Sequence, residues 1–166
     1  DLIWLIAGAI ALSLLAAIAL KPVNAAHADD ATGSSRALLS DPLFLTVIAG
    51  ASLIQGSHAA YYGFATLAWT QRGLDGTTIA ALWGLGVAAE VVLFWLSARL
   101  PPAITPLMLV TFGGAMATVR WTGMALDPPP AILPVLQVLH AFSFGAAHLG
   151  VLRFIAQTSK RGRRAT

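Results

Sequence analysis

Cysteine is absent from this sequence, and charged side chains are rare. Only 10% of the 166 residues are Asp, Glu, Lys or Arg, and Glu90 is the single glutamate. The absence of cysteine excludes disulfides, thiolate-bound metals and a cysteine nucleophile. Besides the carboxylates, four histidines are the only ligands left for a metal or a haem. We therefore expect neither a resident metal nor a cofactor.

Apolar residues, in contrast, are abundant. They make up 57% of the chain, and the mean hydropathy is +0.77. A soluble domain of this size cannot bury so much apolar surface, so the composition predicts a membrane protein in contact with the lipid bilayer. A basic cluster beside an apolar run suits an anionic membrane surface better than nucleic acid. This cluster lies near the end of the chain and consists of Lys160, Arg161, Arg163 and Arg164.

Five apolar segments are near the length of about 20 residues that a membrane-spanning helix requires. Lipid offers no hydrogen-bond partner to a backbone, so all of them should be helices. The turns between them contain proline or glycine, and only the first connection is a longer polar linker. The sequence thus predicts an all-α, polytopic transmembrane helix bundle with five spanning helices, over residues 2–20, 43–69, 77–98, 105–126 and 131–157.

The basic residues predict how this bundle is oriented. Lys and Arg are enriched in loops on the cytoplasmic side of a membrane. Lys21 and Arg36 lie in the linker 21–41 and four further basic residues lie in the tail, whereas Arg72 is alone on the other side. We therefore expect residues 21–41 and the C-terminal tail to be cytoplasmic.

Glu90 is the first candidate functional residue, because it lies near the middle of the third apolar segment. A carboxylate inside a membrane is costly, so it normally faces a protein interior or a water-filled cavity and marks an ion or substrate path. Arg120 is the one basic residue deep in a span, and its planar guanidinium matches a carboxylate. Two alternatives stay open: Glu90 and Arg120 form a structural ion pair, or Asp127 pairs with Arg120 from the outer surface.

Polar and aromatic residues recur at helical spacing on three of the segments, which gives each of them one polar face. Such faces meet around a cavity, or they join helices through polar contacts. Counted by the helical rise, Glu90 and His58 lie within about 3 Å of mid-span, where transporters place substrate and coupling-ion sites. Besides Glu90 and Arg120, the candidate pathway residues are Gln55, His58, Tyr62, Trp83, Gln137, His140 and His148.

Four stretches of the chain resemble a known family. They are LIQGSHAAYYGFATLAW (53–69), LWGLGVAAEVVLFWLS (82–97), the pair Arg120 and Trp121, and LQVLHAFSFGAAHLGVLRFIA (136–156). They resemble the phenylpropionate permease-like branch of the major facilitator superfamily, a fold of twelve helices. The resemblance implies a fragment covering helices six to ten. Residues 1–20 would be the last helix of the N-terminal half, 21–41 the linker between the halves, and 42–166 the first four helices of the C-terminal half.

The resemblance also implies a function. The chain would be part of a proton-coupled symporter of the bacterial inner membrane that carries a small organic acid, with aromatic acids in the candidate class, and it would not be an enzyme. Its partners would be protons, the substrate and the missing helices. Glu90, Arg120 and His140 are similar to the coupling residues of sugar symporters in the same superfamily. Two alternatives are a redox protein with a haem between His58 and His140 or His148, and a structural membrane subunit.

Overall fold

The structure, a computed structural model, describes residues 38–162, with side chains up to residue 158. This part of the chain contains helices and no strand. Helices α3 (Pro42–Gln71), α4 (Gly76–Ser97) and α5 (Pro106–Ala125) are followed by one long rod. The rod consists of η1 (Pro130–Ile132), α6 (Leu133–His140), η2 (Ala141–Ala146) and α7 (Ala147–Gly162). The all-α prediction is confirmed for the described residues. Helices α3, α4 and α5 and the long rod each begin within about one residue of the apolar segment predicted for them.

The helix starts are specified locally. Side-chain oxygens of Asp41, Asp75 and Thr105 accept backbone N–H groups in the first turns of α3, α4 and α5. These N–H groups have no partner within the helix, so the three residues are N-caps. Pro42 and Pro106 occupy first-turn positions of α3 and α5, where a missing N–H costs nothing. Local sequence therefore specifies where α3, α4 and α5 begin.

Three stretches in the described range are long and apolar enough to cross a membrane, namely 42–71, 76–97 and 130–158. Helix α5 has 20 residues, but Arg120 and several polar or small residues interrupt its apolar run, and it is not among them. The predicted segment 2–20 lies outside the described residues. The count of five spanning helices therefore stays a prediction.

Large apolar side chains on these helices point outward. Leu53, Phe64 and Trp95 are 76%, 67% and 66% exposed. Contact of such groups with water is unfavourable, whereas lipid chains are as apolar as the side chains themselves. The outward faces therefore suit a bilayer.

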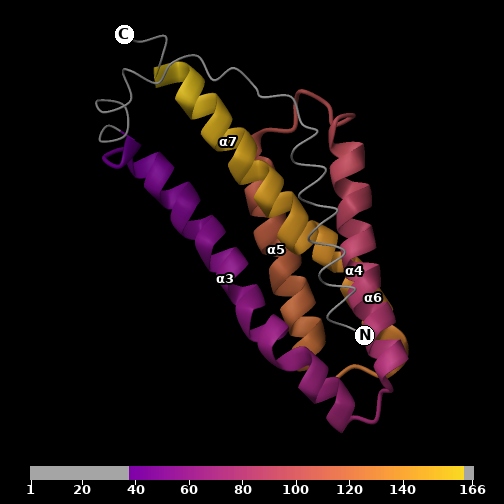
Figure 1. Cartoon of the computed structure of the whole chain (residues 1–166). Coiled ribbons are helices and arrows are strands. Elements are labelled where there is room, and N and C mark those ends of the chain that lie inside the picture. The colour runs from indigo at the N-terminus through magenta and orange to yellow at the C-terminus, as the bar shows by residue number, and fades with distance from the viewer. Residues whose placement is uncertain (1–37, 163–166) are drawn as a thin grey trace, which may run out of the picture. The chain divides into compact units, whose positions relative to one another are not determined.

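Helix α5 contacts α3, α6, η2 and α7, and successive rods run in opposite directions (Figure 1). Its closest approach is to α7. A Cβ atom on Gly113 would lie 2.7 Å from Cβ of Ala147, and one on Gly150 would lie 2.8 Å from the carbonyl oxygen of Pro106. Small residues on both helices thus allow the two backbones to meet, as is common between membrane helices.

The long rod is interrupted by a π-helical turn over Ala141–Ala146. We predicted one uninterrupted helix here. Phe144, within the turn, stacks on His140 with ring centroids 5.1 Å apart and on His148 with centroids 6.1 Å apart. π-Helical turns inside α-helices are rare and are frequent at functional sites. The turn therefore directs attention to the residues around it.

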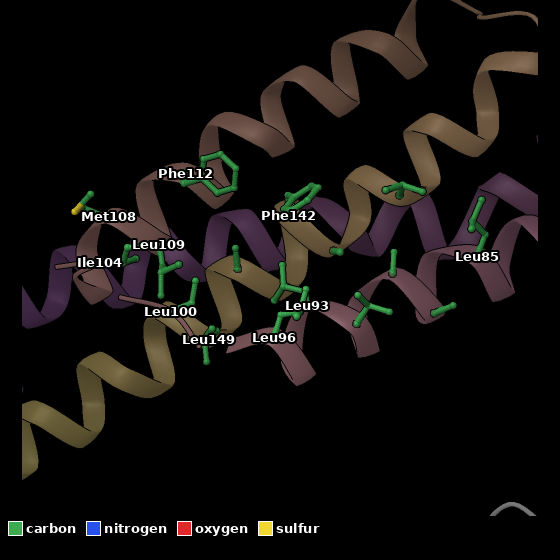
Figure 2. A pocket seen from close by; sticks show the side chains of 16 residues that line it. Leu85, Leu93, Leu96, Leu100, Ile104, Met108, Leu109, Phe112, Phe142 and Leu149 are labelled. Carbon is green, nitrogen blue, oxygen red and sulfur yellow. The ribbon is translucent and has the colours of Figure 1, made fainter. Parts of the chain in front are cut away.

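A groove of about 790 Å³ opens between α4, α5 and the π-helical turn. Figure 2 shows Met108 and Phe112 of α5, Phe142 of η2 and Leu93 of α4 around it. All of its lining side chains are apolar. The groove offers no group that could bind a charged or polar molecule, so it is distinct from the site described next.

Candidate functional site

A second, smaller cavity lies between α3, α4, α6 and η2 and has a volume of about 210 Å³. Four aromatic rings and three polar side chains dominate its wall. The rings belong to Tyr61, Tyr62, Trp83 and Phe144, the polar groups to Glu90, Gln137 and His140, and Gly86 and Val87 complete the lining. The cavity therefore combines an apolar, ring-lined space with one acidic group.

Glu90 and His140 face each other in this wall. Oε2 of Glu90 lies 3.6 Å from Nε2 of His140, and the two side chains are 19% and 8% exposed. The Tyr62 hydroxyl lies 3.3 Å from the same nitrogen. A carboxylate, an imidazole and a phenol from three different helices thus converge on one point, and all three groups can hold or share a proton.

Arg120 lies behind this wall rather than in it. The residue is fully buried, and its guanidinium carbon lies 4.5 Å from the ring centre of Tyr61 and 4.6 Å from that of Trp121. Its Nε donates to the carbonyl oxygen of Leu136 at 2.9 Å, and its Nη1 lies 3.4 Å from Nδ1 of His140. Within the described residues its Nη2 has no hydrogen-bond partner. The guanidinium therefore reaches the cavity only through His140 and Tyr61.

The ion pairs differ from those considered in the sequence. Asp127 lies 3.2 Å from Arg72 and does not pair with Arg120. The basic group nearest to Glu90 is the imidazole of His140, and a direct Glu90–Arg120 ion pair is not among the contacts of the described residues. Glu90 and Arg120 instead flank one imidazole, with Glu90 near Nε2 and Arg120 near Nδ1.

His58 is fully buried next to the cavity. Its Nδ1 lies 2.9 Å from the carbonyl oxygen of Ile54, and its Nε2 lies 3.3 Å from the hydroxyl of Ser143 in the π-helical turn. Its ring touches that of His140 edge to face, with centroids 5.5 Å apart. Both nitrogens of both rings face protein groups, and the rings contact each other directly. This arrangement does not favour a haem between His58 and His140.

The remaining predicted site residues fall in different places. Nε2 of Gln137 donates to the Tyr61 hydroxyl, and Nε1 of Trp83 donates to Thr66 at 3.0 Å, so both cavity residues are held by α3. His148 is exposed and outside the cavity. Gln55 is half-buried, also away from the wall, and its Oε1 has no hydrogen-bond partner in the part of the chain that the structure describes.

Three residues outside the predicted set of pathway residues also shape the site. Tyr61 and Trp121 both lie against the guanidinium of Arg120, Ser143 meets His58, and Trp121 donates to Ser57 at 2.9 Å. A signal for Tyr61 was present, because it lies three residues after His58 and so shares a helical face with it. For Ser143 no such signal exists, since its position depends on the π-helical turn.

The comparison with known families covers the whole chain. Residues 1–166 match the MFS_1 like family. The chain belongs to this family. Members of the major facilitator superfamily are membrane transporters rather than enzymes. This chain accordingly belongs to a multi-pass membrane protein, and its sequence is similar to that of a phenylpropionate permease.

One relative narrows the comparison. The chain is 34% identical over 137 residues to a protein of Escherichia coli (strain K12) named "Probable 3-phenylpropionic acid transporter". The match covers 82% of this chain and 36% of that relative, so the MFS_1 like chain spans about a third of its length. No solved structure matches the chain. Membership in a transporter family favours transport over a redox or purely structural role.

Proposed function

We propose that this chain is part of a proton-coupled secondary transporter, a symporter, for small organic acids. The observation that carries the proposal is the position of Glu90. It is the single glutamate of the chain, it lies in a helix apolar enough to span the membrane, and it faces His140 across a cavity. An intramembrane carboxylate in such a place marks an ion or substrate path.

Glu90 carries the proton in this proposal. Its carboxylate is mostly enclosed, and its nearest basic group is an imidazole rather than a permanently charged guanidinium. Burial disfavours the ionised form of a carboxyl group, so it can take up a proton from one side of the membrane and release it on the other. His140, Tyr62, Trp83 and Gln137 line the pathway together with Glu90. In this proposal Arg120 and His58 support it from behind, and the roles of Gln55 and His148, which lie outside this cavity, stay predictions.

The substrate class follows from the wall of the cavity. Tyr61, Tyr62, Trp83 and Phe144 offer ring faces and edges that pack well against another aromatic ring. The polar groups lie together at Glu90 and His140, where the carboxyl end of an acid would be bound. Aromatic monocarboxylates such as 3-phenylpropionate fit this division, and the name of the relative in Escherichia coli points to the same compound.

The rest of the site comes from a longer protein in this proposal. Residues 1–20 form the last helix of the N-terminal half, 21–41 the cytoplasmic linker, and 42–166 the first four helices of the C-terminal half. Helices beyond this chain close the cavity from the other side. Transporters of this kind work by alternating access around a site at the midplane. The complete protein lies in the bacterial inner membrane with the linker and the tail in the cytoplasm.

The test is proton-gradient-driven uptake of labelled 3-phenylpropionate and a small panel of organic acids into vesicles that contain the complete transporter. Glu90→Gln should abolish accumulation but allow exchange of labelled for unlabelled acid, because glutamine mimics a permanently protonated carboxyl group. Glu90→Asp should keep more accumulation than Glu90→Gln, because it can still take up a proton.

The matched control is Asp127→Asn, which removes a carboxylate that is exposed outside the cavity. It should accumulate the acid like the wild type. Equal accumulation by Glu90→Gln and Glu90→Asp, with both proteins inserted at wild-type levels, would overturn the role of Glu90 as proton carrier. Uptake of none of the acids by the wild type would overturn the substrate class.

A further inference from the structure

We infer that Arg120 is a positioning residue that never touches the substrate: it fixes the tautomer of His140 so that the Nε2–H of His140 becomes the donor for the substrate carboxylate. The inference rests on the proposed function for its last step only. The first steps concern hydrogen positions in the protein itself, and they stand on the geometry around Arg120 and His140.

Arg120 is enclosed by protein groups within the part of the chain that the structure describes. The rings of Tyr61 and Trp121 lie 4.5 and 4.6 Å from its guanidinium carbon and 5.5 Å from each other, and the carbonyl group of Leu136 accepts its Nε–H. The side chain is fully buried and does not line the cavity. A carboxylate in the cavity would therefore meet His140 before it met the guanidinium.

The contact between Arg120 and His140 determines where the imidazole carries its hydrogen. Nη1 of Arg120 lies 3.4 Å from Nδ1 of His140. A guanidinium has only donors, so Nδ1 must offer its lone pair. In a neutral imidazole one nitrogen donates and the other accepts. The hydrogen of His140 consequently lies on Nε2, the nitrogen near Tyr62 and Glu90.

This Nε2–H can donate to either of two negatively charged acceptors. One is the carboxylate of Glu90, 3.6 Å away. The other is the carboxylate of a bound acid, which can take the same hydrogen only when Glu90 is protonated and no longer repels it. One donor shared by two carboxylates makes the ionised Glu90 and the bound substrate mutually exclusive. That exclusion couples the proton to the acid.

His58 provides an internal comparison, because its surroundings demand the opposite tautomer. A carbonyl oxygen can only accept, so the contact of 2.9 Å between Nδ1 of His58 and the Ile54 carbonyl places the hydrogen on Nδ1. Nε2 of His58 is then left as an acceptor, 3.3 Å from the hydroxyl of Ser143, which also lies 3.4 Å from the carbonyl oxygen of His140. Two histidines with ring centroids 5.5 Å apart thus carry their hydrogens on different nitrogens.

Nitrogen-15 NMR of the complete transporter, labelled in its histidine rings and placed in lipid nanodiscs, tests the hydrogen positions without any transport. His140→Gln and His58→Gln identify the signals. We expect the hydrogen on Nε2 in His140 and on Nδ1 in His58. In Arg120→Gln the His140 signals should shift toward the other tautomer while those of His58 stay, which also shows that the fold is intact.

A hydrogen on Nδ1 of His140 in the wild type would overturn the inference, and this result does not depend on whether any variant folds. An unchanged His140 tautomer in Arg120→Gln would overturn it as well. If Arg120→Gln is not inserted, Arg120→Met takes its place, because methionine has a long side chain and offers no hydrogen-bond donor to Nδ1.

Uptake assays then test the role of the donor. Glutamine at position 140 carries an amide N–H at about the reach of Nε2, and asparagine carries one at about the reach of Nδ1. His140→Gln should therefore keep the KM for the acid within about tenfold of the wild type, whereas His140→Asn should raise it by about a further tenfold, as expected for a lost hydrogen bond to a charged group.

The decisive comparison combines the two positions. Arg120→Gln should raise the KM in the wild-type background but have little effect in the His140→Gln background, where the amide N–H exists without help from Arg120. An equal increase in both backgrounds would mean that Arg120 contacts the substrate itself and would overturn the inference. Absence of all uptake would count against the proposed function, while the NMR result would still decide the tautomer.

Discussion

The hydroxyl of Tyr62 lies 3.3 Å from Nε2 of His140, the same nitrogen that Glu90 approaches from α4. Tyr62 therefore shares the hydrogen bond on which the site depends. Replacing Tyr62 with phenylalanine keeps the ring in the cavity wall and removes only the hydroxyl. We expect Tyr62→Phe to transport the acid with a KM raised by about 2- to 10-fold, the equivalent of one hydrogen bond. Uptake kinetics at several acid concentrations measure this.

Tyr62→Ala is the companion variant, because it removes the ring as well. It should raise the KM more than Tyr62→Phe, since it also removes an aromatic wall of the cavity. Equal effects of the two variants would mean that the ring of Tyr62 does not contact the substrate.

Helix α5 should tolerate no side chain at position 113. Alanine normally favours a helix over glycine by about 1 kcal/mol. At Gly113, however, the added Cβ would lie 2.7 Å from Cβ and 2.9 Å from the backbone nitrogen of Ala147, so α5 and α7 would have to separate. We expect Gly113→Ala to destabilise the protein by about 1–3 kcal/mol. Gly63→Ala, where no atom lies within 4 Å of the added Cβ, is the control and should not destabilise. Unfolding in mixed micelles compares them.

Arg153 joins α7 to the end of α4. Its Nη2 donates at 2.7 Å to the carbonyl oxygen of Ser97, one of the last carbonyl groups of α4, which have no partner within the helix. Arg153→Gln should cost about 1.5 kcal/mol, the value of a hydrogen bond from a charged donor. Arg99→Gln, which removes a cation that lies over Trp95, should cost less because that contact is exposed. A larger loss for Arg99→Gln would contradict this account of the α4 terminus.

Substitutions of Asp127 can separate the effect of its backbone conformation on stability from the effect of its ion pair. Its φ of 48° is positive, which is unfavourable for residues other than glycine, and its carboxylate pairs with Arg72 at the surface. An exposed ion pair contributes about 0–1 kcal/mol. Asp127→Gly loses the ion pair but relieves the backbone, so we expect little change. Asp127→Val also loses the ion pair, and its β-branched side chain is strained at a positive φ, so this variant should be clearly less stable than Asp127→Gly. Equal stability of the two variants would mean that the positive φ does not affect stability.

The N-cap of α4 should make stability depend on acid pH. Hydrogen bonds from the backbone N–H and the hydroxyl of Thr78 lower the pKa of Asp75 below its ordinary value of 3.8. A lowered folded-state pKa means that the ionised form stabilises the fold. This contribution is complete above pH 3.8 and is lost as the pH falls below it through the folded-state pKa. Asp75→Asn should remove this part of the pH dependence. If Asp75→Asn loses stability toward acid pH as steeply as the wild type in unfolding experiments, the prediction is wrong.

The rods of this bundle could be predicted from the sequence because membrane helices reveal themselves by length and composition. Runs of apolar residues between turns rich in proline and glycine determine where α3, α4 and α5 begin and end, and N-caps such as Asp41 sharpen the boundaries. That Glu90, His140 and Tyr62 each lie on the polar face of their own helix could also be predicted from helical spacing.

The contacts behind the cavity could not be predicted, because they depend on how the helices are rotated against one another. Whether Arg120 points into a cavity or against the rings of Tyr61 and Trp121 behind it depends on a small rotation of α5, and no spacing within α5 specifies it. The same holds for Asp127, whose partner Arg72 belongs to the turn between two other helices. Spacing along one helix reveals a shared face but not what that face meets.

The π-helical turn changes the arithmetic of the last helix. In an α-helix each residue advances by about 100°, so a residue eight positions later is displaced by about 80° around the axis. The π-helical turn accommodates one additional residue without the rotation of about 100° that this residue would add in an α-helix. Around the helix axis, positions 140 and 148 therefore lie within about 20° of each other. His148 is thus in phase with His140 as if it were seven residues away. In relatives of this protein, one inserted or deleted residue between the two positions would rotate one histidine away from the other, even if both were retained.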